Sequence, residues 1–178
     1  MITLRGERVL LRPLRKEELE TVWQARLRDD SAPWMATPQA YRRLRERVAN
    51  SGRFVDGWLD LGIESDGRLV GEVDARHPPR TMPEGVFELG ISLFDAGDRG
   101  RGLGTEAIRL LTRYLFEHED AQRVQASTSI ENHAMRRVFE KLGFVEEGVL
   151  RSFMPSERGR DDYVLCAIVH ADRGRLEP

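Results

Sequence analysis

The 178-residue chain is poor in the residues that build disulfides and metal sites. Cys166 is the only cysteine, which excludes an intrachain disulfide and a cysteine metal cluster. The four histidines are scattered without the spacing of metal ligands. No apolar run approaches the ~20 residues that a membrane-spanning helix needs. The formal net charge of -2 provides no basic field for nucleic acid. We therefore expect no metal, no membrane segment and no nucleic-acid partner.

The N-terminal stretch MITLRGERVLLRPL has charges throughout and lacks the apolar core of a signal peptide. We therefore expect a cytoplasmic protein. Cys166 lies in the apolar strand pattern YVLCAIV, where a buried and inert thiol is expected. The content of 40% hydrophobic and 33% charged residues is typical of a soluble globular protein. The length suits one domain over residues 1–178.

Apolar periodicity and turn residues predict alternating helices and strands. Helical spacing, with proline and glycine at the ends, favours helices over 16–27, 38–52, 104–119 and 132–143. Strand patterns cover 7–14, 58–65, 69–76, 86–94, 123–130, 144–155 and 162–169. The Asp66-Gly67 turn predicts a hairpin, and the centre of the chain is a strand–loop–helix–strand unit. We therefore predict an α/β fold with a mixed, twisted sheet of about seven strands and four main helices on both faces.

The most informative segment is DRGRGLGTEAIRLL, residues 98–111. Gly100, Gly102 and Gly104 stand directly before a helical pattern, where glycine permits positive φ or close approach of a ligand. The first turn of a helix also presents unpaired amides and a partial positive charge. Together these features indicate a phosphate site built from main-chain amides.

Two nucleotide-binding interpretations compete for this loop. A P-loop needs lysine and Ser/Thr after its last glycine, where this chain has Thr105 and Glu106, so that interpretation is excluded. The dinucleotide pattern G-x-G-x-x-A matches at Gly102, Gly104 and Ala107. A Rossmann sheet needs several βαβ units, however, whereas residues 57–94 favour antiparallel connections. An NAD(P) oxidoreductase is thus kept only as a rival.

Two segments resemble the GNAT N-acetyltransferase superfamily. The run from Arg99 to Gly104, RGRGLG, matches the family's acetyl-CoA signature, Gln/Arg-x-x-Gly-x-Gly/Ala between a strand and a helix. The run NHAMRRVFEKLGF, residues 132–144, matches a second family block at the right spacing. The resemblance is strongest over about residues 84–150 and is closest to the branch with ribosomal-protein N-terminal and small-amine acetyltransferases. It implies a GNAT fold and acetyl-CoA-dependent acetylation of a primary amine, either a peptide N-terminus or a small molecule, without a metal.

The resemblance also implies the residues that bind acetyl-CoA. Backbone amides of the loop hold the pyrophosphate, and they belong to Arg99, Gly100, Arg101, Gly102, Leu103, Gly104 and Thr105. The backbone of Ile91, Ser92 and Leu93 holds the pantetheine arm. Asn132 occupies a position that contacts the arm in the family, although its residue type also suits a helix cap. A homodimer is compatible with this branch.

For catalysis the resemblance implies Glu88, through water, as the base that deprotonates the amine. A solvated carboxylate or an anchor for the substrate cation is the alternative role for Glu88. Many family members have a tyrosine that acts as the general acid and protonates the CoA thiolate. Phe139 stands at that position here and has no proton to donate, so Ser127, Ser129 or water must act as the acid. Because of this replacement, a non-catalytic CoA-binding or regulatory module remains the alternative function. Trp34, Met35 and Tyr41 form either the acceptor wall or a small core patch.

Overall fold

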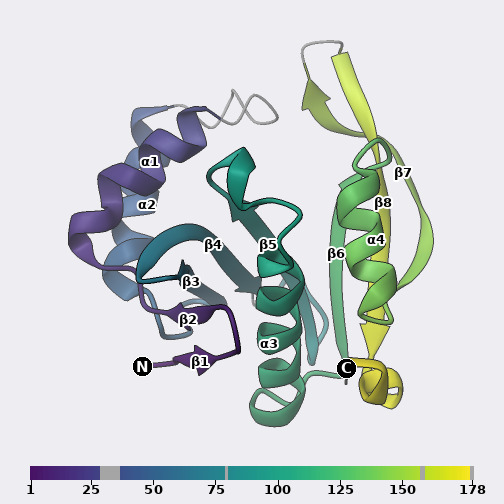
Figure 1. The fold of residues 1–178 in the computed structure, drawn as a ribbon. Helices are drawn as coiled ribbons and strands as arrows, with labels where there is room; N and C mark the ends of the chain where they lie inside the picture. Colours follow the sequence, from purple (N-terminus) through teal and green to yellow (C-terminus); the bar gives the residue numbers. More distant parts are fainter. Residues whose placement is uncertain (29–36, 79, 157–158, 177–178) are drawn as a thin grey trace.

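The computed structural model describes residues 1–28, 37–78, 80–156 and 159–176. Its strands form one mixed sheet in the order β1-β2-β3-β4-β5-β6-β8-β7 (Figure 1). The strands are β1 Leu4–Arg5, β2 Leu10–Arg12, β3 Trp58–Ser65, β4 Arg68–Arg76, β5 Val86–Leu93, β6 Arg123–Ser129, β7 Val145–Ser156 and β8 Gly159–Val169. The predicted α/β class is confirmed. The described sheet has eight strands rather than about seven, because the two-residue β1 pairs with β2 as an additional edge.

Four α-helices accompany the sheet within the described residues. They are α1 Leu19–Leu27, α2 Pro38–Asn50, α3 Leu103–His118 and α4 His133–Lys141. Short 3-10 segments are η1 Lys16–Glu18, η3 Ala96–Asp98 and η4 His170–Leu176. The predicted helix over 16–27 thus begins as a 3-10 turn. No described helix is long and apolar enough to cross a membrane.

The core lies on both faces of the sheet because the strand residues alternate. Phe87 and Leu89 of β5 are buried in the larger cluster with α3, whose Ala107, Ile108 and Leu111 are also buried. On the opposite face, a second cluster joins α1 and α2 through Leu14, Val22, Leu44 and Val48. Burying a leucine or valine side chain stabilises a fold by about 1.5–3 kcal/mol. We call the two sides of the sheet the α3 face and the α1–α2 face.

Candidate active site

The glycine loop enters α3 through two residues with positive φ. Gly100 has φ 73° and Gly102 has φ 82°, and Gly102 is the N-cap of α3. The amide of Glu106 donates the first helical hydrogen bond, to the Gly102 carbonyl at 3.0 Å. The amides of residues 103–105 therefore precede the hydrogen-bonded part of the helix and point out of its positive end. The Arg99 amide, by contrast, donates to the Ala96 carbonyl at 3.1 Å and is occupied.

Charged side chains hold this loop from two sides. Asp98 is 2% exposed and accepts hydrogen bonds from Arg68 at 2.8 Å and from Arg101 at 3.1 Å. The hydrogen bond from Arg68 lowers the pKa of Asp98 and outweighs the opposite effect of burial. Arg8 donates to the Arg101 carbonyl at 2.9 Å, and a Cβ added at Gly102 would lie 3.1 Å from its Nη1. The loop is thus supported independently of any ligand.

Sequence reasoning missed Arg8. It lies between β1 and β2, 93 residues before its hydrogen-bond partner Arg101, and no local pattern marks it. Its guanidinium adds a positive charge beside the free amides at the start of α3. Arg8 is therefore a candidate for binding an anion at this loop together with the main-chain amides.

Strands β5 and β6 run parallel but pair over only three residues. The pairs are Val86–Arg123, Phe87–Val124 and Glu88–Gln125. Beyond Glu88, β5 remains paired with β4, and β6 remains paired with β8. The sheet therefore opens between β5 and β6. The Phe94 amide donates to the Val70 carbonyl at 3.0 Å, so the backbone groups of Phe94 face β4. Successive residues of a strand turn their backbone N–H and C=O groups to opposite sides, so those of Leu93, Ile91 and Leu89 face β6.

By the same alternation, the backbone groups of Ser92 face the opposite side from those of Ile91 and Leu93. They face β4, where Ser92 is opposite Glu72. Of the three residues expected along the pantetheine arm, Ile91 and Leu93 present free edges in the opening, and Ser92 does not. On the α3 face, the side chains of Ile91 and Leu93 lie near Gly104.

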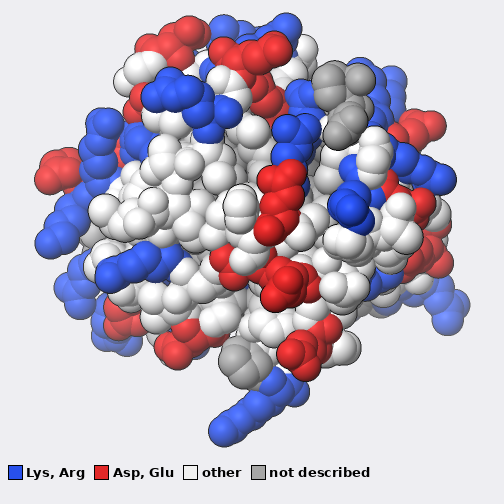
Figure 2. Space-filling model, turned by 90° about the horizontal axis from the view of Figure 1, so that it is seen from below, with Lys and Arg blue, Asp and Glu red and all other residues white. Residues whose placement is uncertain are grey.

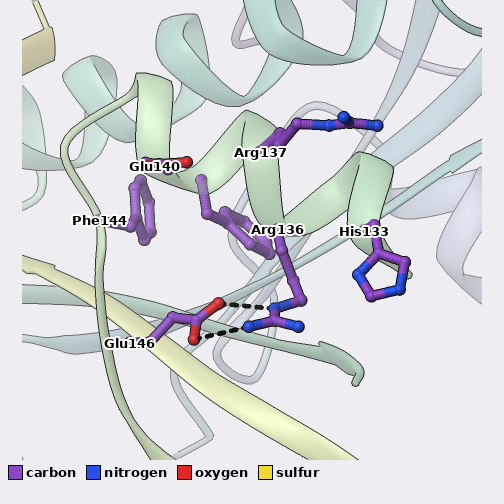
Figure 3. A pocket seen from close by; sticks show the side chains of 7 residues that line it. His133, Arg136, Arg137, Glu140, Phe144 and Glu146 are labelled. Atoms are coloured by element: carbon purple, nitrogen blue, oxygen red, sulfur yellow. Dashed lines mark hydrogen bonds and ion pairs between the residues drawn. The ribbon is translucent and has the colours of Figure 1, made fainter. Parts of the chain in front are cut away.

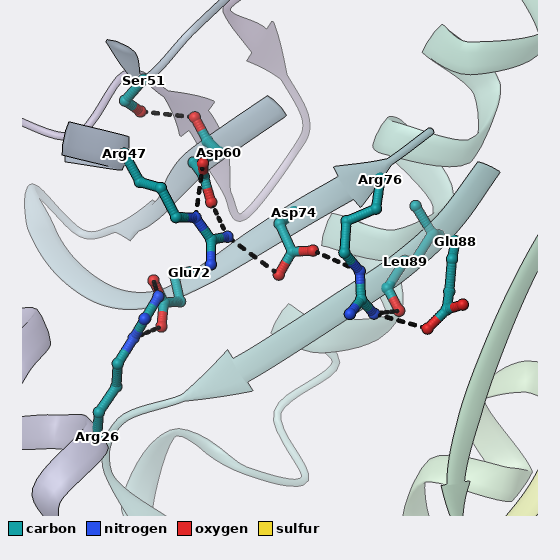
Figure 4. Close-up of polar contacts among 9 residues, drawn as sticks. All are labelled: Arg26, Arg47, Ser51, Asp60, Glu72, Asp74, Arg76, Glu88 and Leu89. Carbon is teal, nitrogen blue, oxygen red and sulfur yellow. Dashed lines mark hydrogen bonds and ion pairs between the residues drawn. The ribbon is translucent and has the colours of Figure 1, made fainter. Parts of the chain in front are cut away.

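The α1–α2 face carries a chain of ion pairs beside this opening (Figure 4). Arg26 of α1 forms two 2.8 Å hydrogen bonds with Glu72 of β4. Figure 4 shows the series continuing toward β5, where Arg76 donates to Glu88 at 2.9 Å. Glu88, the predicted base, therefore has a guanidinium partner on this face.

Arg47 links α2 to the middle of this series. It forms a bidentate pair with Asp60 of β3, and its Nη2 lies 3.7 Å from Oδ1 of Asp74. Arg47 and Arg76 also lie over the ring of Trp58, at 5.0 and 5.7 Å from its centroid. A pocket of about 870 Å³ between α2 and β3 includes Trp58 and Asp60 in its wall.

Ser127 lies across the opening from this network. It is half-buried on β6 and belongs to the same alternating set as Gln125, which pairs with Glu88. Continuing the parallel register by two residues places Ser127 level with Gly90. Glu88 and Ser127 thus flank the place where the sheet opens.

The remaining predicted residues have structural contacts. Asn132 caps α4 by accepting from the Met135 amide at 3.1 Å. Tyr41 packs edge-to-face against Trp23 at 5.1 Å, between α2 and α1. Phe139 is 3% exposed in the core, so it occupies the predicted acid position as a packing residue. Trp34 and Met35 lie outside the described residues.

A second hollow of about 560 Å³ lies against α4 (Figure 3). Figure 3 shows Arg136 turned toward Glu146, which it meets at 2.7 Å, while Arg137 points away from this pair. Arg136 also donates to the Ile130 carbonyl at 3.1 Å. Arg136 therefore fastens α4 to β7.

On the face seen from below, basic and acidic side chains are interspersed rather than gathered by sign (Figure 2). Among the described residues, no three His, Cys, Asp or Glu side chains form a group suited to a metal ion.

A parallel strand pair thus opens beside a glycine-rich helix start. The family model described as an acetyltransferase (GNAT) domain matches residues 8–145. The chain belongs to this GNAT family of N-acetyltransferases, as its sequence predicts.

Three known proteins illustrate the similarity. A Bacillus subtilis protein named as a probable N-acetyltransferase, YjcK, is 33% identical over 108 residues, which are 61% of this chain and 59% of that protein. An aminoglycoside N(6')-acetyltransferase type 1 of Klebsiella pneumoniae is 33% identical over 90 residues, covering 51% of this chain and 44% of that one. The solved structure of a ribosomal L7/L12 alpha-N-protein acetyltransferase with coenzyme A covers 94% of this chain and 98% of its own. Its TM-score is 0.79 at 14% identity, which shows a shared fold.

Proposed function

We propose that residues 1–178 act as one acetyl-CoA-dependent N-acetyltransferase domain that modifies a primary amine. One observation carries the proposal: the amides at the start of α3 lie beside the part of β5 that no longer pairs with β6, where the side chains of Ile91 and Leu93 lie 3.7 and 3.8 Å from the position of a Cβ at Gly104. The first suits a pyrophosphate, and the second suits an extended arm with amide groups. When bound, acetyl-CoA supplies an acetyl thioester open to attack by an amine.

The loop residues would hold the phosphates without a metal. Amides of residues 100–105 would donate to the pyrophosphate oxygens, and Arg8 and the dipole of α3 would add positive field. A side chain at Gly100 would meet nothing within 4 Å, so the loop's outer surface is open to a ligand. Ile91 and Leu93 would bind the arm through their backbone groups. Asn132 uses Oδ1 for its cap, which leaves its side-chain NH₂ to donate to the arm.

The acceptor amine would approach from the α1–α2 face. A primary amine is protonated at neutral pH, with a pKa of ~10.4 for lysine or ~8 for an α-amine, so a nearby group must take its proton. Glu88 and Asp74 are the two carboxylates of this face nearest the opening. Ser127 stands opposite them as a hydroxyl donor. A thiol of pKa ~8.5 leaves without strong acid assistance, so Phe139 does not prevent turnover.

Two acceptor classes follow from the similar proteins. One is a protein N-terminus, and the other is a small polyamine that resembles an aminoglycoside. The charged network of the α1–α2 face suits a cationic acceptor of either class. We place the enzyme in the cytoplasm, where acetyl-CoA and both acceptors are available.

The test is release of CoA from acetyl-CoA, with mass spectrometry of the acceptor. The panel contains peptides with N-terminal Ala, Ser and Met, spermidine and an aminoglycoside. The proposal predicts a gain of one acetyl group by at least one amine and equal release of CoA. Tight acetyl-CoA binding with no acetylated amine would instead support the CoA-binding module that the buried Phe139 favours.

A further inference from the structure

The side chains of the α1–α2 face form rows across β3, β4 and β5. In one row Asp60 is opposite Asp74, and Asp74 is opposite Gly90. In the next row, one step back along β5, Trp58, Arg76 and Glu88 are opposite one another. The Glu88 row is the last in which β5 still pairs with β6. The Asp74 row is therefore the first at the open part of the sheet.

The absence of a side chain at Gly90 leaves room for the Asp74 carboxyl group. A Cβ added at Gly90 would lie 2.6 Å from Oδ1 and 3.2 Å from Oδ2 of Asp74. The carboxyl group thus occupies the space above β5 that a side chain at Gly90 would need. Of the two carboxylates in the row that is level with Ser127, Asp60 and Asp74, Asp74 lies closer to the opening.

Glu88 is held by its neighbour in the row. Arg76 donates to its Oε1 at 2.9 Å and also approaches the Leu89 carbonyl at 3.5 Å. The Arg76 guanidinium lies 5.7 Å from the ring centroid of Trp58, which limits its movement. Using Glu88 as a base would require breaking or sharing this ion pair.

Asp74 has free hydrogen-bonding capacity. Its Oδ2 is buried and accepts no hydrogen bond from the described residues. Two guanidinium groups form ion pairs with Asp74, with Arg76 Nε 3.2 Å from Oδ2 and Arg47 Nη2 3.7 Å from Oδ1. The Arg76–Oδ2 contact does not have hydrogen-bond geometry. A buried carboxylate oxygen without a hydrogen bond is costly unless a ligand completes it.

The charges around Asp74 also favour proton uptake. Burial raises its pKa, Arg76 and Arg47 act to lower it, and Asp60 and Glu72 raise it further, with a net shift upward. These groups come from β3, β4 and α2. A carboxyl group with a raised pKa is a better proton acceptor at neutral pH than an ordinary one.

We propose that Asp74, rather than Glu88, binds the ammonium group of the acceptor and takes its proton, an inference that rests on the proposed acetyltransferase function. One proton moves from the ammonium nitrogen to the Asp74 carboxylate, whose side chain is 22% exposed, and leaves a neutral amine with a lone pair. The amine nitrogen then bonds to the acetyl carbon as the carbon–sulfur bond breaks, and the sulfur leaves with the bonding electrons. The second nitrogen proton passes to the thiolate or to water, and Asp74 returns its proton to solvent. Arg76 keeps Glu88 as a structural anion.

The test compares Asp74→Asn, Glu88→Gln and the matched control Glu72→Gln. Glu72 lies on the same strand and face as Asp74, but its carboxylate is fully paired with Arg26. For the best amine of the panel, we expect Asp74→Asn to lower kcat/KM by about 100-fold or more, the usual contribution of a general base. We expect the other two variants to lose less than about tenfold, because neither carboxylate takes the proton of the acceptor in this scheme. Acetyl-CoA affinity should be unchanged in Asp74→Asn.

A second variant and a titration separate this role from a structural one. Gly90→Ala keeps every carboxylate but displaces the Asp74 carboxyl group, so it should lose activity as Asp74→Asn does. In the free protein, the ¹³C carboxyl resonance missing from Asp74→Asn should titrate above the ordinary aspartate pKa of ~3.9. An active Asp74→Asn variant, a Glu88→Gln variant with the larger loss, or titration at or below ~3.9 would each overturn the assignment. If the parent acetylates no amine, the proposed function itself is contradicted and this assignment with it.

Discussion

Glu106 is the residue whose removal most directly tests how the start of α3 is held. Glu106 is 6% exposed, and its carboxylate accepts hydrogen bonds from the amides of Glu7 and Arg8. Gly6 leaves no room for a Cβ beside it. It therefore joins the β1–β2 connection to the first turn of α3, where a negative charge also suits the helix dipole.

The change Glu106→Ala removes both contacts. Hydrogen bonds to a charged group contribute ~1.5–3 kcal/mol each, and water replaces part of this because residues 7 and 8 are exposed. We expect unfolding free energy to fall by about 2–3 kcal/mol and Tm by about 4–12 °C for a chain of this length. Acetyl-CoA affinity should fall as well, because Arg8 loses the contact that holds it over the loop.

Urea unfolding followed by circular dichroism measures the change. The matched control is Glu117→Ala, on the same helix, whose side chain is 55% exposed and lies 3.9 Å from His118. The control should stay within about 0.5 kcal/mol of the parent. Equal losses in the two variants would refute the anchoring role of Glu106.

Four further predictions concern single residues. Gly104→Ala should stabilise the protein by about 0.5–1 kcal/mol in a thermal melt and keep acetyl-CoA binding, because the added Cβ meets only ordinary contacts at 3.7 and 3.8 Å; a loss of stability would contradict this. Phe139→Tyr buries a hydroxyl in the core, so it should cost about 1–3 kcal/mol in urea unfolding without raising kcat; faster turnover would count against the packing role. Burial raises the pKa of Cys166 to about 11, so a thiol reagent at pH 8 should label it only after unfolding, and rapid labelling of the native protein would refute its inertness. Because the hydrogen bond from Arg68 lowers the pKa of Asp98 in the folded state, its stabilisation is present above the unfolded pKa of ~3.9 and disappears as pH falls through the folded value. The stability difference between the parent and Asp98→Asn should therefore shrink between pH 7 and pH 2, and a constant difference would contradict this.

The features that depend on local chemistry were predictable from the sequence. Glycines directly before an apolar helical pattern indicated where α3 begins, and it begins at Leu103, one residue from the prediction. The Asp66-Gly67 turn correctly indicated the β3–β4 hairpin. Alternation along β5 placed Glu88 on the face opposite Phe87, because a strand turns successive side chains to opposite sides.

Features that depend on strand register or on distant contacts were not predictable. Arg8 reaches the loop across 93 residues, and a single sequence carries no sign of that contact. The alternation also places Asp74 on the face of Glu88, but only the register sets it opposite Gly90. The β1 strand was missed because two residues are too few to show a period.

Calorimetric titration of acetyl-CoA into the parent protein and into Gly102→Val tests the central claim most directly. Gly102 has φ 82°, a conformation that valine cannot adopt without strain, so the variant should lose the amide arrangement at the start of α3. A circular dichroism spectrum of the variant checks that the rest of the fold is retained. The account predicts binding by the parent and loss of binding by a folded variant. A parent that fails to bind acetyl-CoA, or a folded Gly102→Val protein that binds it equally well, would contradict the account.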